Sequence, residues 1–302
     1  MTTIATQQLS GLTADGGAII ERSGSVPNIA GLDRDAVVRI FEHHGVILFR
    51  GFALTPPVVL PFTDQYTEKY APDAIRRQER YGPKGEVRTV DEGNERAPLH
   101  SEASFGATWP EIIWFLCNIP SSSGGYTTLC DGVKLWDQLS RTTQAFFLAQ
   151  PLLFQIKFPT GTSQPGRGKI PWPFPSVGVV GQWDKGAGII ELNVLRYALQ
   201  EARNRRLWFA NHVICTDPII DRMGMADGST IPAEITAEVE RASVALTIDL
   251  HWEAGDLLML DNRRFLHGRR EFAEGDRRDI VQLQTALASF AYGSTSRETI
   301  VR

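Results

Sequence analysis

The sequence predicts a mainly β fold with flanking helices, of the double-stranded β-helix or jelly-roll type. Many short apolar runs have the length of strands, and only a few segments show helical periodicity. Many short strands with few helices are typical of a sandwich or jelly roll. The 302 residues contain no internal repeat and no evident domain linker. We therefore expect one jelly-roll domain over residues 1–302, because barrels and sandwiches of about 200–250 residues often form a single unit.

The N-terminal part is expected to combine two helices with one buried strand. Residues 1–30 are polar and predict an edge strand and loops. Residues 33–45 begin with acidic side chains and end at a glycine, which predicts a helix. Residues 46–49 form a short apolar run, typical of a strand buried on both faces. A second helix is expected over 56–70, because proline is tolerated in a first turn.

Residues 71–98 predict a long irregular loop, since they are charged and contain several glycines and prolines. Such loops are uncommon in compact domains and are usually functional when they occur. This loop leads directly into His100, so we interpret it as a lid over the candidate site described below. A disordered surface excursion explains the same composition equally well.

The remaining segments predict two further helices, over 131–149 and 232–241, and a set of short strands. Residues 160–178 form a proline- and glycine-rich insertion that regular structure does not tolerate. The strands are expected over 112–117, 126–130, 152–158, 189–193, 207–212, 245–250, 256–260 and 278–286.

The composition argues against several classes of function. The formal net charge of −4 disfavours a nucleic-acid partner bound through its phosphates. No apolar stretch approaches the ~20 residues that span a bilayer, and the N-terminus lacks a signal-peptide pattern. The three cysteines are widely spaced and form no CxxC pair, as expected in a reducing compartment. We expect a cytoplasmic protein without membrane or nucleic-acid partners.

Two histidines and one carboxylate form the candidate metal site. In a strand, residues i and i+2 point to the same face, so His100 and Glu102 could present their side chains together. His267, far downstream, would supply the second imidazole, and a jelly roll can bring such distant strands together. This set has the composition of the facial triad that binds Fe(II) and leaves positions open for substrate and oxygen. A lone histidine, by contrast, is more often simply hydrogen-bonded.

A ferrous oxygenase that uses 2-oxoglutarate also needs a cation and a hydroxyl for the far carboxylate of that co-substrate. Arg278 begins an apolar strand after His267, and an arginine fork binds a carboxylate with two parallel hydrogen bonds. Thr127 follows a Gly-Gly turn and offers the hydroxyl. Arg277 competes with Arg278 for the cationic role, and strand register favours Arg278.

Four segments together carry a resemblance to a known family. They are 45–52, the His100-x-Glu102 pair, 124–127, and 252–269. On these the chain resembles the taurine dioxygenase (TauD/TfdA-like) superfamily of Fe(II)/2-oxoglutarate oxygenases, from about Gly45 to the C-terminus. The resemblance implies His100, Glu102 and His267 as metal ligands, Thr127 and Arg278 as 2-oxoglutarate ligands, and Fe(II), 2-oxoglutarate and O2 as cofactors.

The acidic ligand narrows the resemblance further. Glu102 stands where many members have aspartate, which is similar to clavaminate synthase-like enzymes and to amino-acid hydroxylases of nonribosomal peptide assembly. A carboxylate here also argues against the related halogenases. The chain departs from the family at Tyr126, where an acidic residue is usual. The resemblance implies hydroxylation of an amino-acid-like or carrier-protein-bound natural-product intermediate, with desaturation or cyclisation as alternatives.

Two other function classes remain open on the residues alone. A zinc hydrolase or isomerase could use the same three ligands, but it would not need Thr127 or Arg278. A jelly-roll binding protein without activity would be expected to have lost a ligand, and none is missing. A homo-oligomer is compatible with either. Four further side chains are interpreted as structural rather than as pocket-lining, namely Arg269, Arg270, Trp172 and Trp208.

Overall fold

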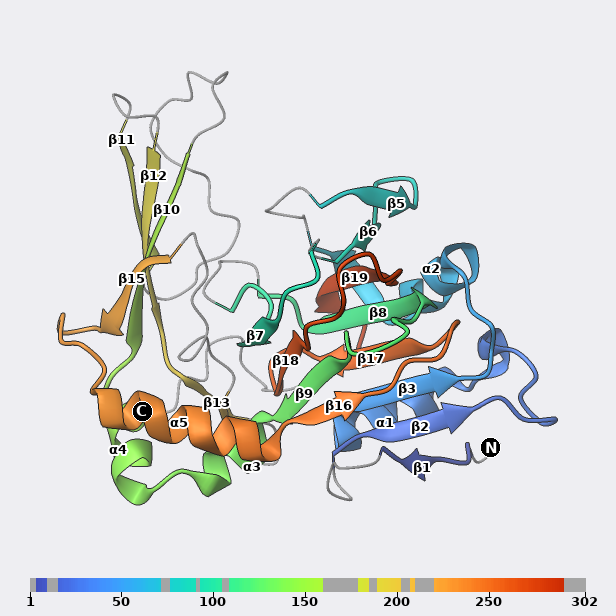
Figure 1. Ribbon diagram of the computed structural model, residues 1–302, viewed down its shortest axis with the longest axis horizontal. Helices are drawn as coiled ribbons and strands as arrows, with labels where there is room; N and C mark the ends of the chain where they lie inside the picture. The colour runs from blue at the N-terminus through green and yellow to red at the C-terminus, as the bar shows by residue number, and fades with distance from the viewer. Residues whose placement is uncertain are drawn as a thin grey trace.

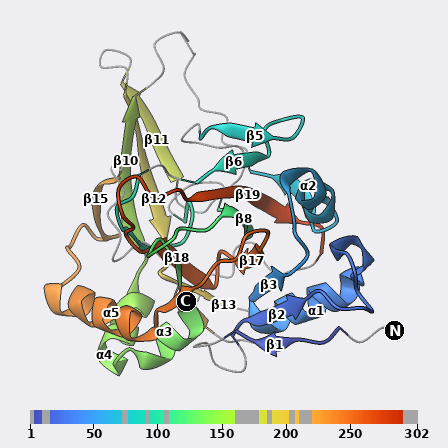
Figure 2. The ribbon, with the colours of Figure 1, turned by 45° about the vertical axis from the view of Figure 1, so that its right-hand side comes forward.

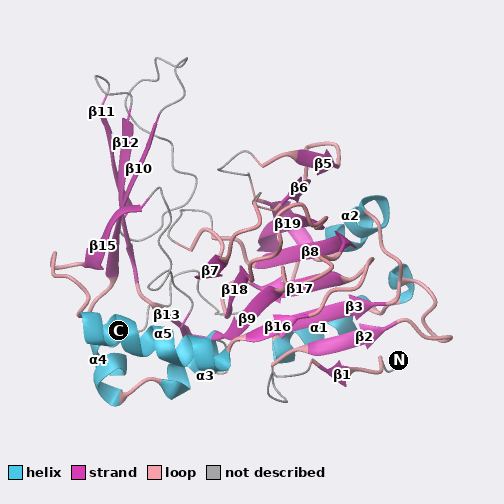
Figure 3. Cartoon of the chain, viewed as in Figure 1, coloured by secondary structure: helices cyan, strands magenta, loops and turns pink. Residues whose placement is uncertain are grey.

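The computed structural model describes residues 4–9, 16–71, 77–90, 93–104, 109–159, 179–184, 189–201, 207–209 and 220–290. Strands dominate the described chain, and helices lie at its margins (Figure 3). The prediction of a mainly β fold is therefore confirmed.

A large, mostly antiparallel sheet occupies the right half of the molecule in Figure 1. Its strands in spatial order are β1 (Gln7–Gln8), β2 (Ala18–Glu21), β3 (Val46–Arg50), β17 (Leu257–Asp261), β8 (Ile112–Ile119), β19 (Asp279–Ala288), β6 (Val87–Thr89) and β5 (Glu79–Tyr81), and β4 (Thr67–Tyr70) pairs with β19. The pair β2–β3 is parallel. The strands β3 and β17 carry near-continuous apolar runs because both of their faces are buried.

A smaller antiparallel sheet packs on one face of the large one. Its order is β16 (Ile248–Leu250), β9 (Thr127–Asp131), β18 (Phe265–Arg269) and β7 (Ala97–His100). Between the sheets, Leu258 of β17 belongs to one apolar cluster with Leu129 and Phe265 of the small sheet. The next residue, Met259, points to the opposite face and packs in a cluster with Phe41. Two facing sheets with this alternation form a jelly roll.

Helices cover the outer face of each sheet. The large sheet is covered by α1 (Arg34–His44) and α2 (Pro56–Asp64), with the 3-10 turn Ile29–Gly31 nearby. The small sheet contributes Cys130 and Leu266 to a third cluster. That cluster also contains side chains from α3 (Gly132–Gln138), α4 (Arg141–Ala149) and α5 (Ala233–Leu246).

A second four-stranded sheet lies beside the jelly roll, at the left of Figure 1 and at the upper left of the turned view in Figure 2. Its order is β11 (Val179–Asp184), β12 (Ile189–Arg196), β10 (Leu152–Pro159) and β15 (Ile220–Met225). The hairpin of β13 (Leu199–Glu201) and β14 (Leu207–Phe209) completes the described strands. The predicted insertion 160–178 lies outside the described residues.

Several element predictions were wrong at their boundaries. The helix expected over 56–70 ends at Asp64, because residues 67–70 pair as β4 with β19. The helix expected over 131–149 is two helices, since the Ser140 side chain accepts a hydrogen bond from the Thr143 N–H and caps a new one. The helix expected over 232–241 continues to Leu246, which shortens the following strand to β16.

The segment 71–98, expected to be irregular, contains β5, β6 and the start of β7. These strands are short and carry no long apolar run, so their pairing partners rather than their own sequences determine them. Of the strand expected over 207–212, β14 is described and residues 210–212 lie outside the described part. In the described chain, no helix combines the length and apolarity needed to cross a membrane.

Candidate metal centre

The two histidines meet across a pair of neighbouring strands. His267 of β18 is the register partner of His100, the last residue of β7. Their ring centroids lie 4.4 Å apart, and the ring of Phe115 packs 5.5 Å from that of His267. The antiparallel pairing thus brings together two imidazoles that are far apart in the sequence.

Glu102 reaches the same point from a turn, not from a strand as the i, i+2 argument assumed. The strand β7 ends at His100, and Glu102 lies in the turn that follows, where Ala103 has a φ of 53°. The buried side chain of Asn262 holds this turn. Its Oδ1 accepts from the Glu102 N–H at 2.8 Å, and its Nδ2 donates to the Glu102 carbonyl at 2.9 Å.

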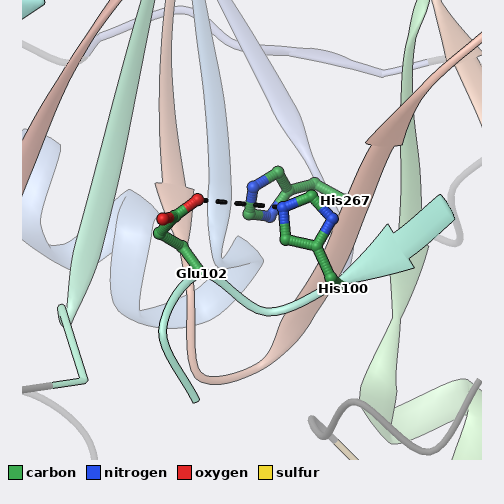
Figure 4. Close-up of side chains that lie close together, drawn as sticks. All are labelled: His100, Glu102 and His267. Carbon is green, nitrogen blue, oxygen red and sulfur yellow. Dashed lines mark ion pairs between the residues drawn. The ribbon is translucent and has the colours of Figure 1, made fainter. Parts of the chain in front are cut away.

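The three side chains point toward one another (Figure 4). One ligand atom from each lies within 4.8 Å of the other two. The His100 Nδ1 lies 2.8 Å from the Pro98 carbonyl oxygen, which can only accept, so in the neutral ring Nε2 keeps its lone pair. Bonds of about 2.0–2.2 Å that meet near right angles place the ligand atoms of a facial set about 3 Å apart. Small side-chain rotations therefore fit this set to a single ion.

The carboxylate of Glu102 is held in its charged form. Burial alone would raise the pKa of Glu102, but a hydrogen bond from His100, when that imidazole is protonated in the metal-free site, and the charge of Arg77 outweigh burial and hold this pKa well below its usual range. Arg77 Nη2 lies 3.2 Å from Glu102 Oε1. A charged carboxylate beside neutral imidazole nitrogens is the donor set that a divalent transition metal prefers.

Thr127 and Arg278 line the same cavity as the three candidate ligands. Arg278 Nε donates to the Gly125 carbonyl at 2.9 Å, which leaves its other N–H groups for a ligand. Burial lowers the pKa of Arg278 to about 10, and the nearby charge of Arg269 acts in the same direction. The guanidinium therefore stays protonated at neutral pH. The competing Arg277 is exposed.

Sequence reasoning missed part of this cavity. Arg269 was interpreted as structural, yet it lines the cavity, and Arg77 and Gln282 line it without belonging to any motif. For Arg77, only its place in the segment that leads to His100 gave a signal. Arg270, by contrast, pairs with Asp249 at 2.8 Å. Trp172 and the side chain of Trp208 lie outside the described part of the chain.

This fold and site define a class of protein, the mononuclear non-haem metal enzymes built on a jelly roll. Comparison with known families narrows the class. The sequence model of the family "Taurine catabolism dioxygenase TauD, TfdA family" matches residues 8–284, and the chain belongs to this family. It is therefore a dioxygenase of the Fe(II)- and 2-oxoglutarate-dependent type, and the predictions of family, fold and cofactors are confirmed.

Individual relatives agree with this membership. A clavaminate synthase-like protein of Arabidopsis thaliana is 24% identical over 268 residues, which cover 77% of this chain and 79% of that protein. The crystal structure of a taurine dioxygenase from Burkholderia xenovorans superposes with a TM-score of 0.61 at 16% identity, covering 95% of this chain and 90% of the other. The PvcB protein of Pseudomonas aeruginosa gives a TM-score of 0.59 at 16% identity, with coverages of 89% and 86%.

Proposed function

We propose that this dioxygenase binds Fe(II) through His100, Glu102 and His267. In this proposal Arg278 and Thr127 bind the far carboxylate of 2-oxoglutarate. The enzyme would hydroxylate a C–H bond of an amino-acid-like or carrier-bound natural-product intermediate, releasing succinate and CO2. The observation that carries the proposal is that all five side chains line one cavity.

Each residue has a role that its surroundings support. Arg278 offers a partly buried cation beside the Gly125 turn, and a fork of N–H donors suits a carboxylate. Thr127 accepts from the Trp252 Nε1–H at 3.0 Å, so its own proton can be donated elsewhere. When bound, the iron would activate O2, which is the oxidant for C–H cleavage, and 2-oxoglutarate would supply two of the four electrons as it is oxidised to succinate and CO2. The protein contributes placement and the exclusion of water.

The substrate class is supported by two relatives and by one residue. One relative is a clavaminate synthase-like protein, and PvcB is described as an Fe, alpha-ketoglutarate-dependent oxygenase from an isonitrile synthetic pathway. A glutamate at position 102, in place of aspartate, resembles the acidic metal ligand of amino-acid hydroxylases. Desaturation or cyclisation would use the same site, and a non-redox hydrolase or a binding protein would need only the three metal ligands.

The lid proposed for 71–98 is supported at three of its residues. Arg77, Val90 and Ala97 all line the cavity. A segment in that position can close over a bound substrate and keep water from the reacting atoms.

An anaerobic titration tests the proposed function. The protein with Fe(II) and 2-oxoglutarate should show the weak visible charge-transfer band of the chelate, and His100→Ala should abolish it. Arg278→Ala should raise the 2-oxoglutarate concentration needed on the order of 10–100-fold, because a hydrogen-bonded charge pair is lost.

The exposed neighbour Arg277 provides the matched control, and Arg277→Ala should leave the titration unchanged. Wild-type protein that shows no band would overturn the proposed function. If the band appears, a screen for succinate release across amino acids and pathway intermediates would identify the substrate, since turnover depends on how well the substrate fills the pocket.

A further inference from the structure

The two oxygens of the Glu102 carboxylate have different surroundings. Oε1 lies 3.2 Å from Arg77 Nη2, whereas Oε2 lies 3.7 Å from His100 Nε2. The Arg77 side chain is 8% exposed, so this contact is shielded from bulk water. One oxygen therefore faces the imidazoles, and the other faces a guanidinium.

This division matters because a carboxylate can bind a metal through one oxygen or through both. A facial triad leaves three positions open when its carboxylate uses one oxygen. If both oxygens bound the ion, one of those positions would be lost to the co-substrates. A group that occupies Oε1 therefore keeps the site open.

The backbone does not determine this choice by itself. Asn262 fixes the main chain of Glu102 through the N–H and the carbonyl, as described above. The carboxylate of Glu102 can still rotate about its terminal bond. This rotation could present the other oxygen, or both oxygens, to a bound ion. Among the residues that line the cavity, Arg77 contacts Oε1 directly.

We propose that Arg77 is a positioning residue that holds Oε1 of Glu102, so that only Oε2 binds the metal. This inference rests on the proposed function, because it assumes that Glu102 is a ligand. The role assigned to Arg77, which precedes β5, is the same whichever substrate the enzyme accepts. Arginine suits this role better than lysine, because its planar fork fixes the direction of the donated hydrogen bond.

The test counts the water ligands on bound Mn(II). Line broadening of the Mn(II) EPR spectrum in ¹⁷O-enriched water should indicate about three water ligands in the wild type and about two in Arg77→Met. The dissociation constant of 2-oxoglutarate from the Mn(II) protein should rise on the order of 10–100-fold in Arg77→Met. Arg77→Lys should restore part of the affinity, and added guanidinium should do the same for Arg77→Met.

The control is Arg80→Met, on β5. Arg80 is exposed and lies outside the cavity of the three ligands, so both measurements should match the wild type. Thermal unfolding checks that each variant is folded. An unchanged water count in folded Arg77→Met overturns the positioning role, even if the affinity for 2-oxoglutarate falls, since loss of charge alone could cause that. A wild type without the chelate band would instead overturn the proposed function.

Discussion

The hydroxyl of Thr127 has a fixed direction because of one neighbour. The indole N–H of Trp252 can only donate, and it lies 3.0 Å from Thr127 Oγ1. The hydroxyl oxygen is therefore the acceptor, and its proton is available on another side. Thr127 is 4% exposed and lines the cavity. Trp252 thus orients the hydroxyl for the carboxylate that we assign to this place.

Substitution of Trp252 tests this orientation. Trp252→Phe keeps an aromatic ring but removes the donor, and the dissociation constant of 2-oxoglutarate should rise by roughly 3–10-fold, the value of about one hydrogen bond. Thr127→Val should have an effect of similar size. If the two act as a unit, the double variant binds no more weakly than Thr127→Val alone. Calorimetry on the Mn(II) protein measures all three, and multiplied effects would show that Trp252 acts elsewhere.

Among individual residues, the sequence identifies candidate site residues by their type and spacing. It does not identify residues that act only through contacts formed in the folded chain. The structure brings His100, Glu102 and His267 close together, yet the strand invoked to align His100 with Glu102 ends at His100, two residues before Glu102. Asn262 does that work instead, from 160 positions away. Arg77 has no pattern around it, because its partner is determined only when the chain folds.

The junction between α1 and β3 shows how one glycine links two elements. Gly45 ends α1 with a φ of 69°, and its N–H donates to the Phe41 carbonyl at 2.7 Å. A Cβ built there would lie 2.8 Å from the ring of Phe265 in β18. Both the conformation and the space therefore require glycine at this position.

Gly45→Ala should lower the free energy of unfolding by at least about 2 kcal/mol, from left-handed strain and the clash with Phe265. Urea unfolding measures the change. Gly24→Ala is the matched control, because a Cβ there meets no atom within 4 Å and its φ is not positive. That variant should stay within about 0.5 kcal/mol of the wild type. Equal losses in the two variants would contradict the argument.

Elements with strong local signals were predicted well. The helix from Asp33 to Gly45 has both caps in its sequence, and the strands β3, β8 and β17 are continuous apolar runs. The strand β4 was assigned to a helix because its four residues carry no alternation, and its identity comes from pairing with β19. The polar strand β5 likewise forms through pairing with a neighbouring strand, β6.

The cavity lies where the two sheets of the jelly roll meet. Phe115 and Gln282 come from the large sheet, and Thr127 and His267 come from the small one. A ligand bound in this cavity contacts both layers at once. Its binding free energy therefore adds to the stability of the whole fold, since the unfolded chain has no such site.

Thermal unfolding with and without ligands tests this coupling. Mn(II) with 2-oxoglutarate, each at about 100 times its dissociation constant, should raise Tm by about 5 °C or more. Chelation of the metal should reverse the shift. His267→Ala should show almost none of it, and an equal shift in that variant would indicate binding outside the cavity.

Among the described strands, β7 is the outermost one of the small sheet, so His100 stands on a strand that pairs on one side only within that part of the chain. An ion bound by both His100 and His267 would cross-link this strand to β18. In protein without metal, the amide protons of β7 should then exchange with solvent before those of β9 and β18. Metal binding would thus suppress a local opening of β7, which otherwise exposes backbone groups to unwanted pairing with other chains.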